Sequence, residues 1–401
     1  MVHRRQASLD PRFGARTPDS VRRLKRRPPG RPRWCALGLL SLGLSLSLGA
    51  QAQEFSSSGF ASLVLGRTSG SCVASGLAPV HSSNCTRYIA DWAHAGVYGD
   101  EVTASPESRA GLQATLKFNP QWSATTQLTT RAVKDQALNL EWLYLAYQIA
   151  PEWTLQLGRK RLPLYYYSDF QDVGFAYNTI RPSPDVYGWD VVNYNGASLS
   201  YSTELGAWSL RTEALIGAEN SKKNPYARLY NEAPKDVAWG DIGGVSFEFS
   251  KDWFSGRLSY VRSTVKQVDR DSGVVEIESN GPKQDFLGLA LNADIDHWIV
   301  RSEFGQAKRQ SLNYKAKYYL LTLGYRMGSF TLTGGSSAYL ETSYDLAAYA
   351  PVKLRSQLLA LRYEVHKGGA LKLQFDRVRD STSTPGAGNA QLLSASYDVV
   401  F

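Results

Sequence analysis

The chain has 401 residues, of which 43% are hydrophobic, and this apolar content excludes a disordered protein. It carries 45 Lys and Arg against 36 Asp and Glu, an excess that usually points to nucleic acid or an anionic surface. Eleven of those basic residues, but only two acidic ones, fall within residues 1–52, so 34 of each remain beyond residue 52. The charge therefore belongs to the N-terminal segment, and no nucleic-acid partner is expected.

Residues 1–52 are predicted to be a cleaved secretory signal peptide. An arginine-rich head precedes an apolar stretch at 34–48, and Ala50-Gln51-Ala52 provides a small-x-small cleavage site. The apolar stretch is short for a membrane-spanning helix, which needs about 20 residues, so a retained anchor is the less favoured alternative. Because the head is unusually long, Val21 is an alternative start. We expect residues 53–401 to form a single exported domain.

Three cysteines occur in the chain, and Cys35 would leave with the signal peptide. Cys72 and Cys85 flank a segment rich in Gly, Ser and Asn, and in an exported chain they are predicted to form a disulfide that closes one loop. No His-x-His or Cys-x-x-Cys spacing accompanies them, so no metal site and no cofactor are predicted.

Strict alternation of apolar and polar residues begins at 109–118. The even positions are Ala, Leu, Ala, Leu and Phe, whereas the odd positions are Arg, Gly, Gln, Thr and Lys. The same period of two recurs at Trp208–Ile216, Phe286–Ile295, Tyr319–Arg326, Leu371–Asp376 and Gln391–Phe401. No comparably long stretch has the 3.6-residue period of an amphipathic helix, so the pattern predicts an all-β protein.

Short turns alternate with long loops along the chain. The seven turns lie near residues 119–120, 150–151, 205–206, 251–252, 296–297, 328–329 and 367–369. The eight loops lie near 68–107, 133–138, 162–193, 218–239, 266–283, 309–313, 341–352 and 380–389. These fifteen connections separate about 16 strands, and an even number places both chain ends on the side of the short turns. An open sheet would leave two unpaired edges, so we expect a closed antiparallel barrel.

Tryptophan follows five of the seven short turns, at Trp122, Trp153, Trp208, Trp253 and Trp298. An apolar ring with a polar N–H suits the boundary between hydrocarbon and water, and such a ring of residues is typical of a transmembrane barrel. The alternative is a soluble β-sandwich with core tryptophans. The spacing favours an aromatic girdle on a transmembrane antiparallel β-barrel with short periplasmic turns and long extracellular loops.

Two segments carry a resemblance to a known family. The chain ends in Leu393, Ala395, Tyr397, Val399 and Phe401, and residues 158–164 read Gly-Arg-Lys-Arg-Leu-Pro-Leu ahead of the long loop at 162–193. In these features residues 53–401 resemble the Gram-negative outer-membrane porins.

The resemblance implies several properties. Tyr397 and Phe401 would belong to the signal that the barrel-assembly machinery reads, and the loop 162–193 would fold into the barrel as a constriction. The protein would be a homotrimer in outer-membrane lipid and lipopolysaccharide. The loop lacks the family's common Pro-Glu-Phe-Gly-Gly motif.

The positions out of phase with the apolar residues should face the lumen, because a charge facing hydrocarbon costs about 2–4 kcal/mol at mid-membrane. This phase predicts the following lumen-facing residues: Arg109, Lys117, Arg131, Arg211, Arg257, Arg301, Arg326, Arg362 and Lys372, with Glu213, Asp294, Glu303, Glu364 and Asp376. The loop contributes Asp169, Asp172, Arg181, Asp185 and Asp190. We expect wall arginines to face loop carboxylates across the narrowest point, or, as the alternative, to pair with nearby acids.

Arg159 and Arg161 break this phase, because they share parity with Leu155 and Leu157. Either they lie at the outer rim among lipopolysaccharide phosphates, or a bulge near Gly158 turns them inward.

The predicted function is a water-filled channel for passive diffusion of small hydrophilic solutes and ions. One alternative is a substrate-selective channel, for example for anions or carboxylates. A barrel hydrolase is less favoured, because only His81 and His94 offer a loop base and no Gly-x-Ser-x-Gly elbow occurs. The chain is therefore not expected to be an enzyme.

Overall fold

The computed structural model describes residues 54–70, 86–133, 137–230, 233–279, 281, 284–347, 349–382 and 388–401. The predicted signal peptide, Cys72, Cys85 and His81 lie outside the described residues.

Strands make up most of the described chain. The strands of the main sheet are β1 (Glu54–Ser69), β4 (Arg109–Lys117), β5 (Trp122–Arg131), β6 (Asn139–Ala150), β7 (Trp153–Arg161), β8 (Asn193–Leu205), β9 (Trp208–Ser221), β10 (Lys235–Lys251), β11 (Phe254–Asp269), β12 (Val275–Glu278), β13 (Gln284–Ile295), β14 (Trp298–Arg309), β15 (Tyr314–Met327), β16 (Phe330–Ser343), β17 (Lys353–His366), β18 (Gly369–Asp380) and β19 (Ala390–Val400). A separate hairpin consists of β2 (Tyr88–Asp91) and β3 (Gly96–Tyr98).

The helical segments of the described chain are short. They are α1 (Pro225–Arg228) and the 3-10 turns η1 (Ser168–Phe170), η2 (Gly174–Ala176) and η3 (Gln310–Leu312). Among the residues that the structure describes, no helix has the length and apolarity needed to span a bilayer.

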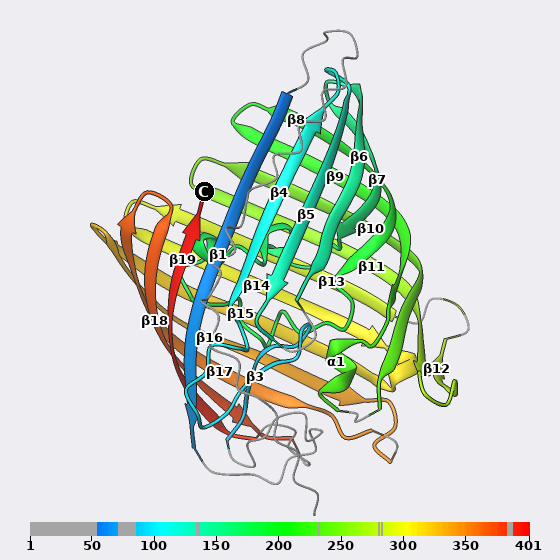
Figure 1. Cartoon of the computed structure of the whole chain (residues 1–401), viewed down its shortest axis with the longest axis vertical. Coiled ribbons are helices and arrows are strands. Elements are labelled where there is room, and N and C mark those ends of the chain that lie inside the picture. Colours follow the sequence, from blue (N-terminus) through cyan, green and yellow to red (C-terminus); the bar gives the residue numbers. More distant parts are fainter. Residues whose placement is uncertain are drawn as a thin grey trace, which may run out of the picture. The chain divides into compact units, whose positions relative to one another are not determined.

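The main sheet closes into a barrel, which confirms the predicted fold class (Figure 1). Neighbouring strands pair antiparallel around the ring, and β1 pairs with both β19 and β4, so the first strand seals the two ends of the sheet. The short strand β12 pairs only with β11 and extends a loop, which leaves sixteen strands in the ring. Closure leaves no unpaired strand edge in this ring of the described chain, as a structure in hydrocarbon requires.

The two ends of the barrel differ as the turn pattern predicts. Seven short hairpin turns lie at one end, here called the turn end, and the long connections, with α1, β3 and β12, lie at the other, the loop end (Figure 1). Several turns contain a residue with positive φ, including Gly206 at 62°, Asp296 at 53° and Gly368 at 90°. Tight hairpins require such a conformation, and Gly and Asp adopt it at low cost.

The barrel exposes apolar side chains outside and buries polar ones inside. On β19, Leu393 is 56% exposed and Tyr397 38% exposed, whereas Ser394 and Ser396 on the other face are buried. β15 alternates in the same way over most of its length. This is the reverse of a soluble protein and suits a hydrocarbon surroundings.

The five girdle tryptophans lie at the turn end, at or next to the start of their strands, and are 36% to 49% exposed. Three of them pack on a tyrosine of the neighbouring strand, with ring centroids 4.5 Å apart for Trp122–Tyr147, 4.8 Å for Trp153–Tyr201 and 4.7 Å for Trp298–Tyr325. The exposed aromatic side chains are therefore gathered at the turn end.

Apolar residues also line part of the interior, which the sequence pattern did not predict. Phe286 and Tyr318 on the wall pack against Tyr165, with ring centroids 5.4 Å and 6.0 Å away. They belong to one buried cluster that joins β8–β15 to the connection between β7 and β8. This connection, residues 162–192, is called L3 below and is one residue shorter than predicted, because β8 begins at Asn193.

Candidate functional site

L3 lies inside the barrel and contacts the wall opposite the strand from which it comes. Lys372 on β18 donates to the carbonyl oxygens of Gly174, at 2.6 Å, and Thr179, at 2.9 Å. Arg362 on β17 donates to those of Phe175 and Tyr177, at 2.6 Å and 2.7 Å. The loop leaves β7, almost half-way round the ring, so these contacts place it across the lumen.

Asp172 fixes one side of L3 in a group of buried charges, here called the Asp172 cluster. Its carboxylate accepts from Arg131 at 2.5 Å and from Arg161 at 2.8 Å, and Arg161 also reaches Glu141 at 2.7 Å. Each of these side chains is at most 7% exposed. Burial by itself raises the pKa of Asp172, but Arg131 and Arg161 outweigh it and hold that pKa well below its usual range.

Arg109 contributes to the same cluster through the backbone. Its Nε donates to the carbonyl oxygen of Asp172 at 2.8 Å.

Arg181 fixes the other side of L3 in a second group, the Arg181 cluster. Its guanidinium donates two hydrogen bonds to Glu107, at 2.8 Å and 2.7 Å, and further bonds to Asp376 at 2.5 Å and Ser394 at 2.9 Å. It also lies 5.7 Å from the ring centre of Tyr88. Glu107 and Tyr88 come from the β1–β4 connection, so this connection also enters the barrel mouth and holds L3.

The other predicted loop carboxylates have different partners. Asp169 pairs with Arg257 at 2.7 Å, and Asp190 pairs with Arg309 at 2.9 Å. Asp185 accepts instead from the neutral hydroxyl of Ser337, at 2.7 Å.

Several more of the predicted wall residues form polar contacts with L3 or with one another. Glu303 accepts from the backbone N–H of Tyr166 at 3.1 Å and from the hydroxyl of Tyr187. Two arginines pair with wall carboxylates: Arg301 with Asp294 at 2.7 Å, and Arg211 with Glu213 at 3.1 Å. Two wall arginines contact loop carboxylates directly: Arg131 pairs with Asp172, and Arg257 pairs with Asp169. This is the alternative of pairing with nearby acids, and not a separation across open water.

Arg161 turns inward, and Gly158 provides the local reason. Gly158 has φ at 138°, and a Cβ there would lie 2.2 Å from the carbonyl oxygen of Leu143, so only glycine fits. Beyond it the alternation breaks, and Arg161 joins the Asp172 cluster. Arg159 pairs with Glu219 at 2.6 Å. Arg161 therefore points inward, but without the expected bulge, because β7 pairs in unbroken register on both sides of Gly158.

Further charged residues of the lumen escaped the sequence analysis, among them Glu107, Glu141, Lys160, Arg309 and Glu341. Glu141 lies at an irregular register opposite Gln127 and Leu128, which shifts the alternation of β6 by one residue. Glu107 lies in a connection, where no alternation exists to indicate direction.

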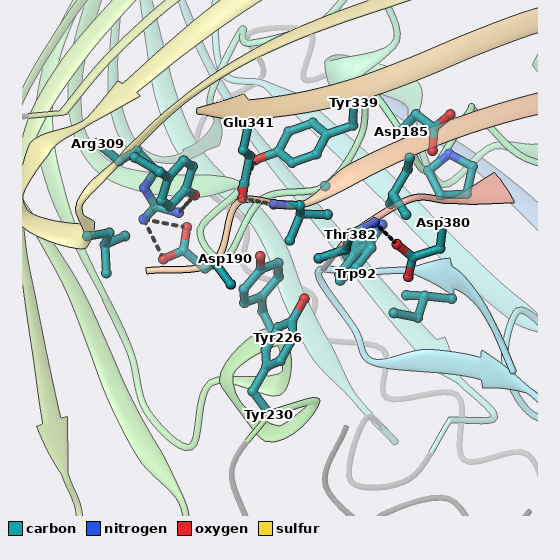
Figure 2. Close-up of a pocket in the computed structure, with 18 of the residues that line it drawn as sticks. Trp92, Asp185, Asp190, Tyr226, Tyr230, Arg309, Tyr339, Glu341, Asp380 and Thr382 are labelled. Atoms are coloured by element: carbon teal, nitrogen blue, oxygen red, sulfur yellow. Dashed lines mark hydrogen bonds and ion pairs between the residues drawn. The ribbon is translucent and has the colours of Figure 1, made fainter. Parts of the chain in front are cut away.

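L3 separates two cavities of the lumen. The one toward the loop end has a volume of about 600 Å³, and its lining includes Asp185 and Asp190 of L3 (Figure 2). The one toward the turn end has about 630 Å³, and its lining includes Tyr166 and Phe170 of L3 with the wall residue Arg257. No group of His, Cys, Asp and Glu suited to hold a metal ion occurs among the described residues.

No family model matches the chain, and no curated protein matches its sequence. Solved structures share its fold. The anion-selective porin from Comamonas acidovorans has a TM-score of 0.53 at 13% identity, covering 87% of this chain and all of that one. The outer membrane channel DcaP of Acinetobacter baumannii has a TM-score of 0.54 at 10% identity, covering 87% of this chain and 97% of that one. The trimer form of OmpT, an outer membrane protein of Vibrio cholerae, has a TM-score of 0.51 at 8% identity, covering 88% of this chain and 100% of that one. The chain therefore has the porin fold.

Proposed function

We propose, from the porin fold, that the chain is a Gram-negative outer-membrane porin, a water-filled channel for passive diffusion of small hydrophilic solutes and ions. One observation carries the proposal. The sixteen-strand ring is closed, apolar outside and charged inside, and L3 lies across its lumen between two cavities. L3 is then the constriction, with Arg109, Arg131, Arg257 and Arg362 on the wall around it.

The location and partners follow from the same proposal. The signal peptide directs export, the short turns face the periplasm, and the long loops face outward, next to lipopolysaccharide. The barrel-assembly machinery reads β19 and the residue that follows it, Phe401, which is 71% exposed. The trimer form of a protein with this fold supports a homotrimer. We propose in addition that Cys72 and Cys85, which lie outside the described residues, form a disulfide.

The hydrolase alternative finds less support in the loop histidine that the structure describes. His94 Nδ1 lies 2.8 Å from Asp91, but among the described residues no Ser, Thr or Cys side chain hydrogen-bonds to the His94 ring. A hydrolase of the Ser-His-Asp type needs a nucleophile within hydrogen-bond distance of the histidine ring.

Planar-bilayer recording tests the channel. The folded barrel is expected to insert as conducting steps, with conductance proportional to salt concentration and a reversal potential in a salt gradient that reports the preferred ion sign. Protein boiled in detergent is the control. Folded protein that never conducts would contradict the channel, and a conductance that saturates with one solute would favour the substrate-selective alternative.

A further inference from the structure

The cavity toward the loop end is lined by aromatic rings from five segments of the chain (Figure 2). Trp92 lies near Tyr226 and Tyr230, with ring centroids 5.8 Å and 6.3 Å away. On another wall, Tyr314 stacks on Tyr349 at 5.2 Å. Such surfaces accept the apolar part of a solute and attract cations to the faces of their rings.

Carboxylates outnumber cations in this lining. Four of them, from Asp185, Asp190, Glu341 and Asp380, accompany the two guanidinium groups of Arg87 and Arg309. Arg309 is engaged by Asp190, with two contacts at 2.9 Å and 3.2 Å.

Glu341 and Asp185 are each only 4% exposed, yet their hydrogen bonds from described residues come from neutral donors. Glu341 accepts from the hydroxyls of Tyr339 and Tyr349, both at 2.8 Å, and from the Val352 N–H at 2.7 Å. Asp185 accepts from Ser337 at 2.7 Å. No ion pair with a described Lys or Arg forms at either carboxylate.

A buried carboxylate is costly unless a cation balances it, and neutral donors compensate only in part. A cation that enters the cavity therefore gains attraction from both carboxylates and from the ring faces. An anion would meet Glu341 and Asp185 and be repelled. A neutral solute would use the rings but not the charge.

We propose that this cavity binds an organic cation, an ammonium or guanidinium group on an apolar or aromatic body, with the charge at Glu341 and Asp185 and the body against Trp92 and Tyr226. This rests on the proposed function, because the cavity then lies on the solute path. The site retards such cations on their way to L3 and concentrates them there.

The test uses the full barrel in planar bilayers with three probes of one shape: phenethylammonium, 2-phenylethanol and 3-phenylpropionate. The ammonium is expected to reduce the potassium chloride current at a concentration about tenfold lower than the alcohol, which corresponds to about 1.4 kcal/mol. Glu341→Gln and Asp185→Asn should each raise that concentration several-fold, with block measured as a fraction of each variant's own current without probe. Asp285→Asn on β13, a carboxylate that accepts from the exposed Tyr260 hydroxyl, is the matched control and should change nothing.

Equal block by the ammonium and the alcohol would overturn the proposal in favour of a stacking site for neutral solutes. Stronger block by 3-phenylpropionate, or no block at all, would also overturn it. Isothermal titration of the detergent-folded barrel with phenethylammonium reads binding without current. A barrel that binds the cation but does not conduct would contradict the channel function and support the cation site. A barrel that conducts but does not bind the cation would support the channel function and contradict the cation site.

Discussion

Asp172 and Glu341 are both buried carboxylates of the same lumen, but their partners differ. Asp172 on L3 contacts two guanidinium groups, whereas Glu341 on β16 accepts only from two tyrosine hydroxyls and a backbone N–H of the described chain. The charge of Asp172 is neutralised by the arginines that hold the loop. The charge of Glu341 is not neutralised by a described cation and remains available to a solute. The position of the guanidinium groups, more than the number of carboxylates, thus decides which carboxylates hold the loop and which can attract a solute.

The largest expected effect comes from Arg181→Ala. The change leaves Glu107 and Asp376 buried without their shared cation, at a cost near the upper end of about 3–5 kcal/mol. L3 should loosen, so urea unfolding in micelles shifts to lower concentration and single-channel conductance rises. Arg377→Ala, an exposed arginine next to Asp376, is the control. An unchanged conductance in the Arg181 variant would show that this cluster does not hold the loop.

A smaller loss is expected from Asp172→Asn, about 3 kcal/mol, because Arg131 and Arg161 keep only Glu141 between them. The lumen also gains positive charge at L3, so the reversal potential in a potassium chloride gradient should move toward anion preference. A shift toward cations would contradict the position of Asp172 inside the barrel.

Gly158→Ala tests the turn of Arg161 into the Asp172 cluster. A methyl group there would meet the carbonyl oxygen of Leu143, and φ at 138° strains any residue with a side chain, so we expect a loss of about 2 kcal/mol in urea unfolding. Gly334→Ala on β16, where an added Cβ meets no atom within 4 Å, is the control. Equal stability of the two variants would mean that β7 does not need the glycine conformation.

The smallest expected effect is that of Glu341→Gln on stability. No ion pair with a described residue is lost and an amide oxygen still accepts, so the loss should stay near 1 kcal/mol. A loss as large as that of Asp172→Asn would remove the contrast between the two carboxylates.

Alternation along the strands predicted the barrel and the inward direction of residues such as Arg109 and Arg362, because a strand in a barrel has only two faces. It could not predict that the Arg161 side chain points inward, since the conformation of the nearby Gly158 depends on its contact with the neighbouring strand β6. Nor could it predict the partners of L3. Arg181 meets Glu107 from 74 residues away and Ser394 from 213 residues away, and such contacts exist only once the ring is closed.

The most direct test of the account is a cross-link between L3 and the wall. The hydroxyl oxygens of Ser183 on L3 and Ser337 on β16 lie 2.8 Å apart, close enough for two cysteines to bridge. With Cys72→Ser and Cys85→Ser as background, the pair Ser183→Cys and Ser337→Cys is expected to form a disulfide in the assembled barrel, read by mass and gel mobility. Ser183→Cys with Ser200→Cys on β8, whose hydroxyl bonds to the carbonyl of Thr154, is the control and should stay reduced. A first pair that also stays reduced under oxidation would contradict a loop held across the lumen.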